Sequence, residues 1–458
     1  MKTKKNNLYS LILGIVSIAF YLFFAFLDGA VICVDSPSYI NMSITREFLY
    51  PALLAIFRSL FGEPYLLYVV ILQSLLAAFA AWKITIYIRD KFKLGYVSST
   101  VIFLIPIFVS LLNRFIAKRG SMYSNSILTE GVAIPLFLLF ICYIYDYLVE
   151  ETYKSFIVSA ILSGILIALR KQMYITFILL FLVYLFVQIR SKENTDRSWI
   201  RSIIKAFVVC AIIFLSVTLL DHTFNYIVRG RFVGHSSDNR FVLTMVIYAS
   251  EEEYAEVLPE KLQPLFLDIY ETCNEQGYLM NNAGKGWYNN VSHFGDNYDF
   301  IQIDTMWPAI RQFVGENYTD DSTDLELITD EITNEMIISL LPKTVPKITR
   351  VLCNNFLSGL ITTIAQRNPI LIYYSCVAYL GYILLLGFYW KRIGKVDDTI
   401  KLCLLTLLSI VVNVGLVSTV IFCQTRYTIY NMPMFYISLC VMFIRMREVW
   451  LVRGNESV

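Results

Sequence analysis

Long apolar runs separated by short polar segments recur along most of the chain. Ten of these runs approach the roughly 20 residues that an α-helix needs to cross a bilayer. They lie at 8–27, 66–82, 94–112, 131–149, 155–169, 174–189, 206–220, 370–390, 402–423 and 428–444. The pattern predicts an all-α polytopic membrane protein with about ten transmembrane helices.

The distribution of Lys and Arg predicts the orientation of these helices. The first run follows a basic head, and its length favours an uncleaved first helix over a signal peptide. Short basic segments also occur at 89–93, 190–205, 391–395 and 445–453. Because Lys and Arg are enriched in cytoplasmic loops, we expect these segments and both termini in the cytoplasm.

The remaining segments then face outward. We expect 1–220 to form an N-terminal transmembrane module, with a first outer loop at 28–65. A polar and acidic stretch, 221–349, lies between the seventh and eighth helices and is too long for an unstructured loop, which predicts a small extracytoplasmic domain. Residues 350–458 form a C-terminal transmembrane module. Segment 344–366 is ambiguous, and we place it outside.

Within the first outer loop, "REFLYPALLAIFRSLFG" (46–62) is too short and too charged to span a bilayer comfortably. An amphipathic helix of this kind typically lies in the membrane interface. The sequence therefore predicts an interfacial helix directly after the first transmembrane helix.

Composition agrees with a membrane protein and narrows the possible partners. Of 458 residues, 57% are hydrophobic and only 16% are charged, against roughly a quarter in soluble proteins. The net charge of +2 argues against a nucleic-acid partner. Nine scattered cysteines show no metal-binding spacing and no disulfide framework, so we interpret them as packing residues. The absence of a transit peptide and of a disulfide framework favours a bacterial plasma membrane.

Charged residues gather at the predicted outer ends of the helices. They are Asp35, Glu130, Arg170, Lys171 and Arg426. Carboxylates and cations together above a helix bundle suggest a site for an anion at the membrane surface, such as a lipid-linked phosphate. Simpler interpretations remain open: a solvated loop acid, a carboxylate favoured by a helix dipole, and basic side chains reaching for headgroups.

Several of these residues lie in motifs that resemble a known family. The motifs are "VDSPSYI" (34–40), "TREFLYPALLAIFRSLFG" (45–62), "ILTEGVAIPLF" (127–137), "LRK" (169–171) and "TRYTIYNMPMFYISL" (425–439). In the order of these motifs and in the side of the membrane predicted for them, the chain resembles the GT-C glycosyltransferases. This superfamily includes lipid A aminoarabinose transferases and protein O-mannosyltransferases. The resemblance covers most of the transmembrane part and excludes 221–349.

The resemblance implies a GT-C-like fold and inverting transfer of a sugar from polyprenyl phosphate to a hydroxyl group. The acceptor would be a glycan, a lipid or a cell-wall polymer at the outer face of the membrane. It assigns the general base to Asp35, and the second catalytic candidate, Glu130, could orient the acceptor, assist a metal or serve as a second base. Candidates for donor-phosphate binding are Arg170, Lys171 and Arg426, and candidates for substrate contact are Tyr39, Arg46 and Tyr427. No metal ligands are predicted, and a divalent cation is left open as a cofactor.

Two other function classes remain. A polysaccharide polymerase or ligase would depend on arginines in a large outer loop, and "VRGRF" (228–232) keeps that alternative open. A transporter of lipid-linked glycans would need ionisable residues in mid-membrane, and the predicted spans contain almost none.

The orientation can be tested by cysteine labelling from each side of the membrane. Single cysteines placed in 28–65, 113–130 and 221–349 should react with an impermeant maleimide added outside, because the basic loops alternate with these segments. Labelling of 221–349 from the cytoplasmic side alone would contradict the orientation.

Overall fold

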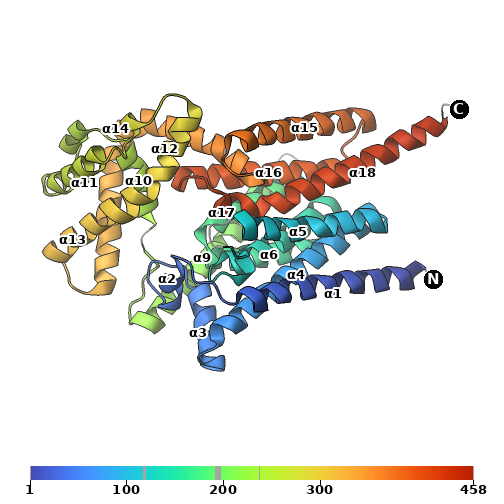
Figure 1. Ribbon diagram of the computed structural model, residues 1–458, viewed down its shortest axis with the longest axis horizontal. Coiled ribbons are helices and arrows are strands. Elements are labelled where there is room, and N and C mark those ends of the chain that lie inside the picture. The colour runs from blue at the N-terminus through green and yellow to red at the C-terminus, as the bar shows by residue number, and fades with distance from the viewer. Residues whose placement is uncertain (1, 117–119, 191–197, 237, 457–458) are drawn as a thin grey trace. The chain divides into compact units, whose positions relative to one another are not determined.

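The computed structural model describes residues 2–116, 120–190, 198–236 and 238–456. This part of the chain is predominantly helical (Figure 1). Its one pairing of extended segments is an isolated bridge between Val31 and Ser126. The prediction of an all-α protein is therefore confirmed for the described residues.

Nine helices in the described part of the chain are long and apolar enough to cross a membrane, and each overlaps a predicted apolar run. They are α1 (Lys2–Asp28), α4 (Tyr65–Phe92), α5 (Tyr96–Ile116), α6 (Glu130–Glu150), α8 (Tyr174–Arg190), α9 (Ser198–Arg229), α15 (Pro369–Ile393), α16 (Asp398–Val420) and α18 (Met432–Glu456). The chain is a multi-pass membrane protein by this criterion.

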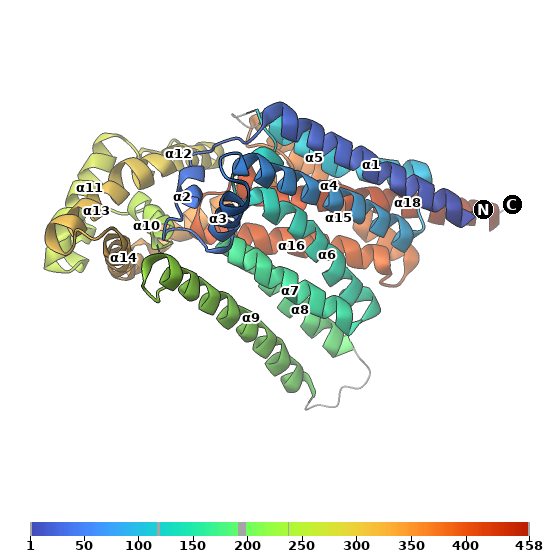
Figure 2. The ribbon, with the colours of Figure 1, turned by 90° about the horizontal axis from the view of Figure 1, so that it is seen from below.

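The tenth predicted run, 155–169, forms helix α7 (Tyr153–Leu169), which has 17 residues. Such a helix is about 26 Å long, slightly less than the roughly 30 Å hydrocarbon core. It packs against both α6 and α8. The start of α1 and the end of α18 lie at the same end of the bundle (Figures 1 and 2). Chain ends on the same side of a membrane require an even number of crossings, and counting α7 with the nine longer helices gives ten.

The helices form two compact units. The first contains residues 1–224, 376–412 and 429–458, and the second contains 225–375 and 413–428. The predicted division into two transmembrane modules and an extracytoplasmic domain stays a prediction, because the fold alone does not place a membrane.

Helix α4 is the centre of the first unit, and α1, α5 and α6 pack against it. Its residues Ala78 and Ile84 are buried. Between α1 and α4, Ser17 Oγ donates a hydrogen bond to the Ala78 carbonyl at 2.9 Å, and Trp82 Nε1 donates to the Ser10 carbonyl at 2.8 Å. Because hydrocarbon offers no hydrogen-bond partners, polar groups in such a bundle are satisfied by each other.

The stretch 46–62 forms helix α3 (Leu49–Phe61), as the sequence predicts. Tyr50 and Leu54 are buried, whereas Leu60 on the same helix is 68% exposed. In Figure 1, α3 runs across the direction of α1 and α4, at the end opposite to the chain ends. This placement fits an interfacial helix.

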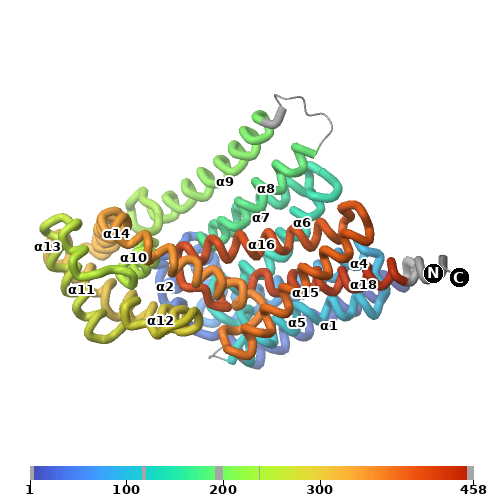
Figure 3. Tube along the Cα trace, turned by 90° about the horizontal axis from the view of Figure 1, so that it is seen from above, coloured from blue at the N-terminus to red at the C-terminus, as the bar shows by residue number. Residues whose placement is uncertain are grey.

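Helix α9 is packed only lightly within the first unit. Of its most apolar stretch, 6% is buried, and Figure 3 shows it standing apart from the rest of the bundle. Val209, Ile213 and Val217 make its contacts with the core. Most of its apolar surface is therefore left for lipid.

The second unit is a helical domain with its own core. Leu243, Phe266, Ile310 and Met336 are fully buried in that core. Its main elements are α10 (Asn239–Tyr248), α11 (Gln263–Glu275), α12 (Trp287–Asp299), the π-helical segment η6 (Phe300–Met306), α13 (Trp307–Asn317), α14 (Ser322–Ile364) and α17 (Thr425–Thr428). The ambiguous segment 344–366 falls in and just after α14, which is not among the candidate spans in the described part of the chain.

Segment η6 joins α12 to α13 without a break. A π-helix makes i→i+5 hydrogen bonds and thereby holds more residues per turn than an α-helix. Ile301 and Met306 are fully buried, whereas Ile303 is 52% exposed. The segment thus carries a continuous apolar face from one α-helix to the next.

Gly359 on α14 offers a test of the packing in the second unit. A Cβ atom there would lie 2.5 Å from Val414 Cγ1 and 2.8 Å from Cys423 Sγ. Gly359→Ala should lower the free energy of unfolding by about 1–3 kcal/mol, because the neighbours must move. Thermal unfolding of the purified protein in detergent measures this.

Gly381→Ala on α15 is the matched control, because beyond its chain neighbours and its own helix backbone no atom lies within 4 Å of the added Cβ. Alanine has the higher helix propensity, so this variant should be as stable as the wild type or slightly more stable. Equal stability of both variants would contradict the close approach at Gly359.

Candidate functional site

The loop after α1 is fastened to the segment that leads into α6. Val31 and Ser126 form the parallel bridge: Val31 N donates to the Asn125 carbonyl at 2.9 Å, and Ile127 N donates to the Val31 carbonyl at 3.0 Å. Ser36 Oγ adds a hydrogen bond to the Ile127 carbonyl at 2.8 Å. These contacts bring two segments together that are far apart in the sequence, one carrying Asp35 and the other Glu130.

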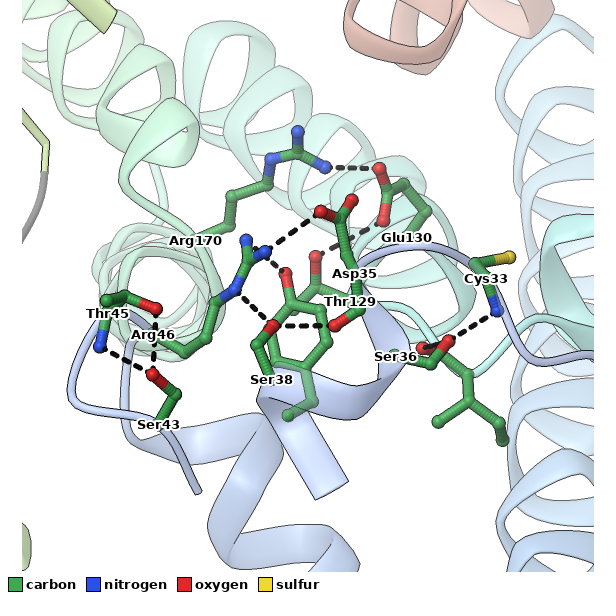
Figure 4. Close-up of polar contacts among 12 residues, drawn as sticks. Cys33, Asp35, Ser36, Ser38, Ser43, Thr45, Arg46, Thr129, Glu130 and Arg170 are labelled. Carbon is green, nitrogen blue, oxygen red and sulfur yellow. Dashed lines mark hydrogen bonds and ion pairs between the residues drawn. The ribbon is translucent and has the colours of Figure 1, made fainter. Parts of the chain in front are cut away.

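Asp35 lies just before the short helix α2 (Ser36–Ile40) and forms an ion pair with Arg46, with 2.9 Å between Oδ1 and NH2 (Figure 4). Arg46 Nε also donates to Ser38 Oγ at 2.7 Å. Its guanidinium lies 4.7 Å from the centre of the Tyr39 ring. The Asp35 side chain is 27% exposed and the Arg46 side chain 17%. Asp35 is thus a partly buried, ion-paired carboxylate and not an ordinary solvated loop residue.

Glu130 is the first residue of α6 and is completely buried. It forms an ion pair with Arg170, and its Oε2 accepts a hydrogen bond from Thr129 Oγ1 at 3.3 Å (Figure 4). Arg170 lies in the corner between α7 and η2 (Lys171–Met173). The N-terminus of α6 favours a negative charge, but a carboxylate so deeply buried also needs the cation.

Tyr39 links the two ion pairs electrostatically. Burial raises the pKa of its phenol; the charges of Arg46 and Arg170 lower that pKa, and those of Glu47 and Glu130 raise it. The phenol is therefore protonated at neutral pH and can donate a hydrogen bond. Figure 4 draws Asp35 and Glu130 in one region, flanked by the guanidinium groups of Arg46 and Arg170.

The first unit thus brings five of the predicted site residues into one cluster: Asp35, Tyr39, Arg46, Glu130 and Arg170. Lys171 follows Arg170 directly, and its backbone N–H donates to Glu47 Oε1 at 2.7 Å. Arg426 and Tyr427 belong to the second unit, where the Arg426 guanidinium lies 5.9 Å from the Tyr427 ring centre.

Sequence reasoning missed three residues around this cluster. Glu47 follows Arg46 in a quoted motif and holds the Lys171 backbone. Tyr50 and Gln73 form a buried hydrogen bond of 2.8 Å. A glutamine inside an apolar run is itself a signal that could have been used, because an amide in a membrane helix needs partners.

A small cavity adjoins Glu130 inside the first unit. Its volume is about 50 Å³, enough for a few water molecules. Polar residues Ser110, Asn113 and Ser124 line it together with small residues of α4 such as Ala77 and Ala81. The buried carboxylate therefore has a partly polar hollow beside it.

No metal centre is evident in the part of the chain that the structure describes. Within those residues, no group of three or more His, Cys, Asp or Glu side chains lies close enough together to hold an ion. The carboxylates of the cluster are instead neutralised by arginines.

The arginines that favoured a polymerase also have local contacts. Arg231 pairs with Asp324 and, at 3.7 Å, with Asp321. Arg229 NH1 donates to Asn225 Oδ1 at 2.5 Å. The Arg231 pairs connect the segment after α9 to the start of α14, whereas the Arg229 contact lies within α9.

Comparison of the chain with family models, with curated proteins and with solved structures gave no match. The function is therefore inferred from the residues of the cluster and from the motifs in which they lie.

Proposed function

We propose that the protein is an inverting glycosyltransferase that moves a sugar from a polyprenyl-phosphate donor to an acceptor hydroxyl. The observation that carries the proposal is the cluster of two carboxylates, each paired with an arginine, at one end of a membrane helix bundle. Resemblance of the motifs around these residues to GT-C enzymes supplies the reaction and the donor.

Asp35 is the general base in this proposal. It takes the proton of the acceptor hydroxyl, the hydroxyl oxygen bonds to the anomeric carbon, and the bond from that carbon to the phosphate oxygen breaks. Polyprenyl phosphate leaves with the bonding electrons, and attack from the opposite face inverts the anomeric centre. A carboxylate within hydrogen-bond reach of the hydroxyl is suited to this proton transfer.

Accessibility favours Asp35 over Glu130 as the base. The Asp35 side chain is 27% exposed, whereas Glu130 is fully buried and engaged by Arg170 and Thr129. We therefore assign Glu130 the role of orienting Arg170. If the roles were reversed, the acceptor would have to reach a carboxylate that is closed off on both oxygens.

Phosphate binding is assigned to Arg170 and Lys171, with Arg46 and Tyr39 contacting substrate. From the resemblance alone, Arg426 is proposed to bind phosphate and Tyr427 to contact substrate; both belong to the second unit. Guanidinium groups bind phosphate oxygens through two parallel, charge-assisted hydrogen bonds. Arg170 stays paired with the buried Glu130, whereas a donor phosphate that engages the Arg46 guanidinium group competes with Asp35 for it. That exchange releases the Asp35 carboxylate for proton transfer at the moment the donor is in place.

The setting of the reaction follows from the resemblance and the charge pattern. The membrane is the bacterial plasma membrane, the cluster faces outward, and the acceptor is a cell-envelope glycan, a lipid or a wall polymer. A polymerase or ligase is the nearest alternative reaction, and transport of a lipid-linked glycan is the more distant one.

Replacing Asp35 by Asn tests the general base. The amide keeps the size but cannot accept the proton, so kcat should fall about 100- to 10,000-fold while donor affinity stays within a few-fold of the wild type. The assay uses purified protein, a polyprenyl-phosphate sugar and an acceptor.

Asp28→Asn is the matched control, because Asp28 is also a partly buried carboxylate, paired with Arg114, at the same end of the first unit. It should keep near-normal rates. Normal turnover by Asp35→Asn, with Glu130→Gln inactive, would transfer the role of base to Glu130.

Donor binding tests the phosphate clamp. Arg170→Lys, Lys171→Ala and Arg426→Ala should each weaken affinity for polyprenyl phosphate, by about 10- to 150-fold where a charge-assisted contact worth roughly 1.5–3 kcal/mol is lost. Arg170 is changed to Lys because a cation must remain beside the buried Glu130. Calorimetry or a fluorescent lipid phosphate measures the affinity.

Arg114→Ala serves as the control, since Arg114 pairs with Asp28 outside the cluster. It should leave donor affinity unchanged. Unaltered affinity in all three test variants would show that these cations serve the fold or the headgroup region.

A further inference from the structure

We infer that Gln73 of α4 is a positioning residue that fixes both carboxylate–arginine pairs in one arrangement. The inference rests on the proposed function for its catalytic meaning, but its structural part can be measured without any reaction. Gln73 is fully buried inside a candidate membrane-spanning helix, where an amide without partners would be costly.

Every polar atom of the Gln73 amide has a protein partner. Tyr50 OH donates to Oε1 at 2.8 Å. Nε2 donates to the carbonyl oxygens of Ser124 and Ser126, each at 3.0 Å. One side chain thus ties α4 to α3 and to the segment before α6. Such fully satisfied buried networks specify one arrangement of the segments they join.

Towards Asp35, the connection runs through two tyrosines. The Tyr50 ring meets the Tyr39 ring edge to face, with 5.3 Å between centres and an interplanar angle of 86°. The Arg46 guanidinium lies over that Tyr39 ring at 4.7 Å and pairs with Asp35. Holding Tyr50 in place therefore holds the surface on which Arg46 rests.

Towards Glu130, the connection is direct. Ser126 belongs to the bridge with Val31, a few residues before Glu130. Gly131 follows Glu130, and a Cβ atom at Gly131 would lie 2.6 Å from Gln73 Cδ. The amide is packed against the first turn of α6, and only a glycine leaves room for it. Gln73 therefore fixes the position at which α6 begins with Glu130.

Positioning by Gln73 matters for the reaction because it fixes the geometry of the site. Gln73 touches no reacting atom, but the base and the phosphate-binding cations must be held at a fixed separation. A misplacement of 1 Å can cost about 100-fold in rate. The loop with Asp35 and the segment before Glu130 are also joined by the backbone bridge, by Ser36 and by the Asn125 amide, which donates to the Gly29 carbonyl at 3.2 Å.

The first test compares kinetics. Gln73→Leu keeps the size but removes all three hydrogen bonds, and kcat should fall about 10- to 100-fold while the KM for donor changes less than about three-fold. Tyr50→Phe removes only one of those bonds and should lose less. Gln188→Leu is the matched control on α8, where Gln188 donates to Tyr147 OH at 3.5 Å, and should keep wild-type kcat.

The second test reads the loop itself through Cys33, which is 6% exposed and next to the bridge. In Gln73→Leu, the rate of Cys33 alkylation, followed by mass spectrometry, should rise about ten-fold or more, because the loop is released. Cys273 of the second unit is the internal control: it is fully buried, and burial raises the pKa of its thiol to about 12.

Unchanged Cys33 alkylation in Gln73→Leu overturns the inference. Faster alkylation with normal kcat also overturns it, because Gln73 would then stabilise the loop without positioning the site. A wild-type protein that transfers no sugar overturns the proposed function instead, and the Cys33 rates still decide whether Gln73 fixes the loop.

A double-mutant cycle separates this network from general loss of stability. Gly131→Ala should reproduce the loss in kcat, because its methyl group displaces the Gln73 amide. Combined with Gln73→Ala, which removes the obstructed side chain, it should add little further loss. Fully additive losses in the double variant would show that the two positions act independently and would overturn the inference.

Discussion

The ion pair between Glu130 and Arg170 is the contact on which the rest of the site depends. Glu130 is fully buried at the start of a membrane helix, where an uncompensated charge would be destabilising by several kcal/mol. Arg170 has to remain beside it, so the corner between α7 and α8 is held against the first turn of α6. The loop that carries Asp35 then lies on a rigid support, which this corner and the first turn of α6 form together.

A second consequence is that the site is balanced in charge before any substrate arrives. Two carboxylates face two guanidinium groups within one region. In surroundings of low dielectric constant, adding a phosphate to such a balanced set is unfavourable unless it takes over an existing pairing. Electrostatics therefore favours exchange of partners over simple addition, which suits a site that must expose its base only when the donor is present.

The membrane helices and part of the site could be predicted from the sequence, because their signals are local. Apolar length identifies nine spans, and the short run 155–169 is recognised with them because it lies between two stronger ones. Asp35, Tyr39 and Arg46 lie close together in the chain, so their proximity in the fold follows from one short loop.

Contacts between distant segments could not be predicted in this way. The Val31–Ser126 bridge and the hydrogen bond from the Lys171 backbone to Glu47 leave no periodic signal. The pairing of Arg170 with Glu130 was not predicted, because the two residues lie 40 positions apart in the chain. The individual helices of the second unit could not be predicted either, since polar helices of a small domain lack the long apolar runs that mark a membrane span.

The π-helical segment η6 has a consequence for how the second unit tolerates insertions and deletions. A π-turn holds more residues than an α-turn, so a single-residue deletion within 300–306 is absorbed when the segment returns to α-helical turns. Ile310 and Val314 then stay buried in the core and Arg311 stays outside it. A second deletion meets no widened turn and would rotate α13 about its own axis by about 100°. The length of this stretch is therefore tolerant by one residue and no more.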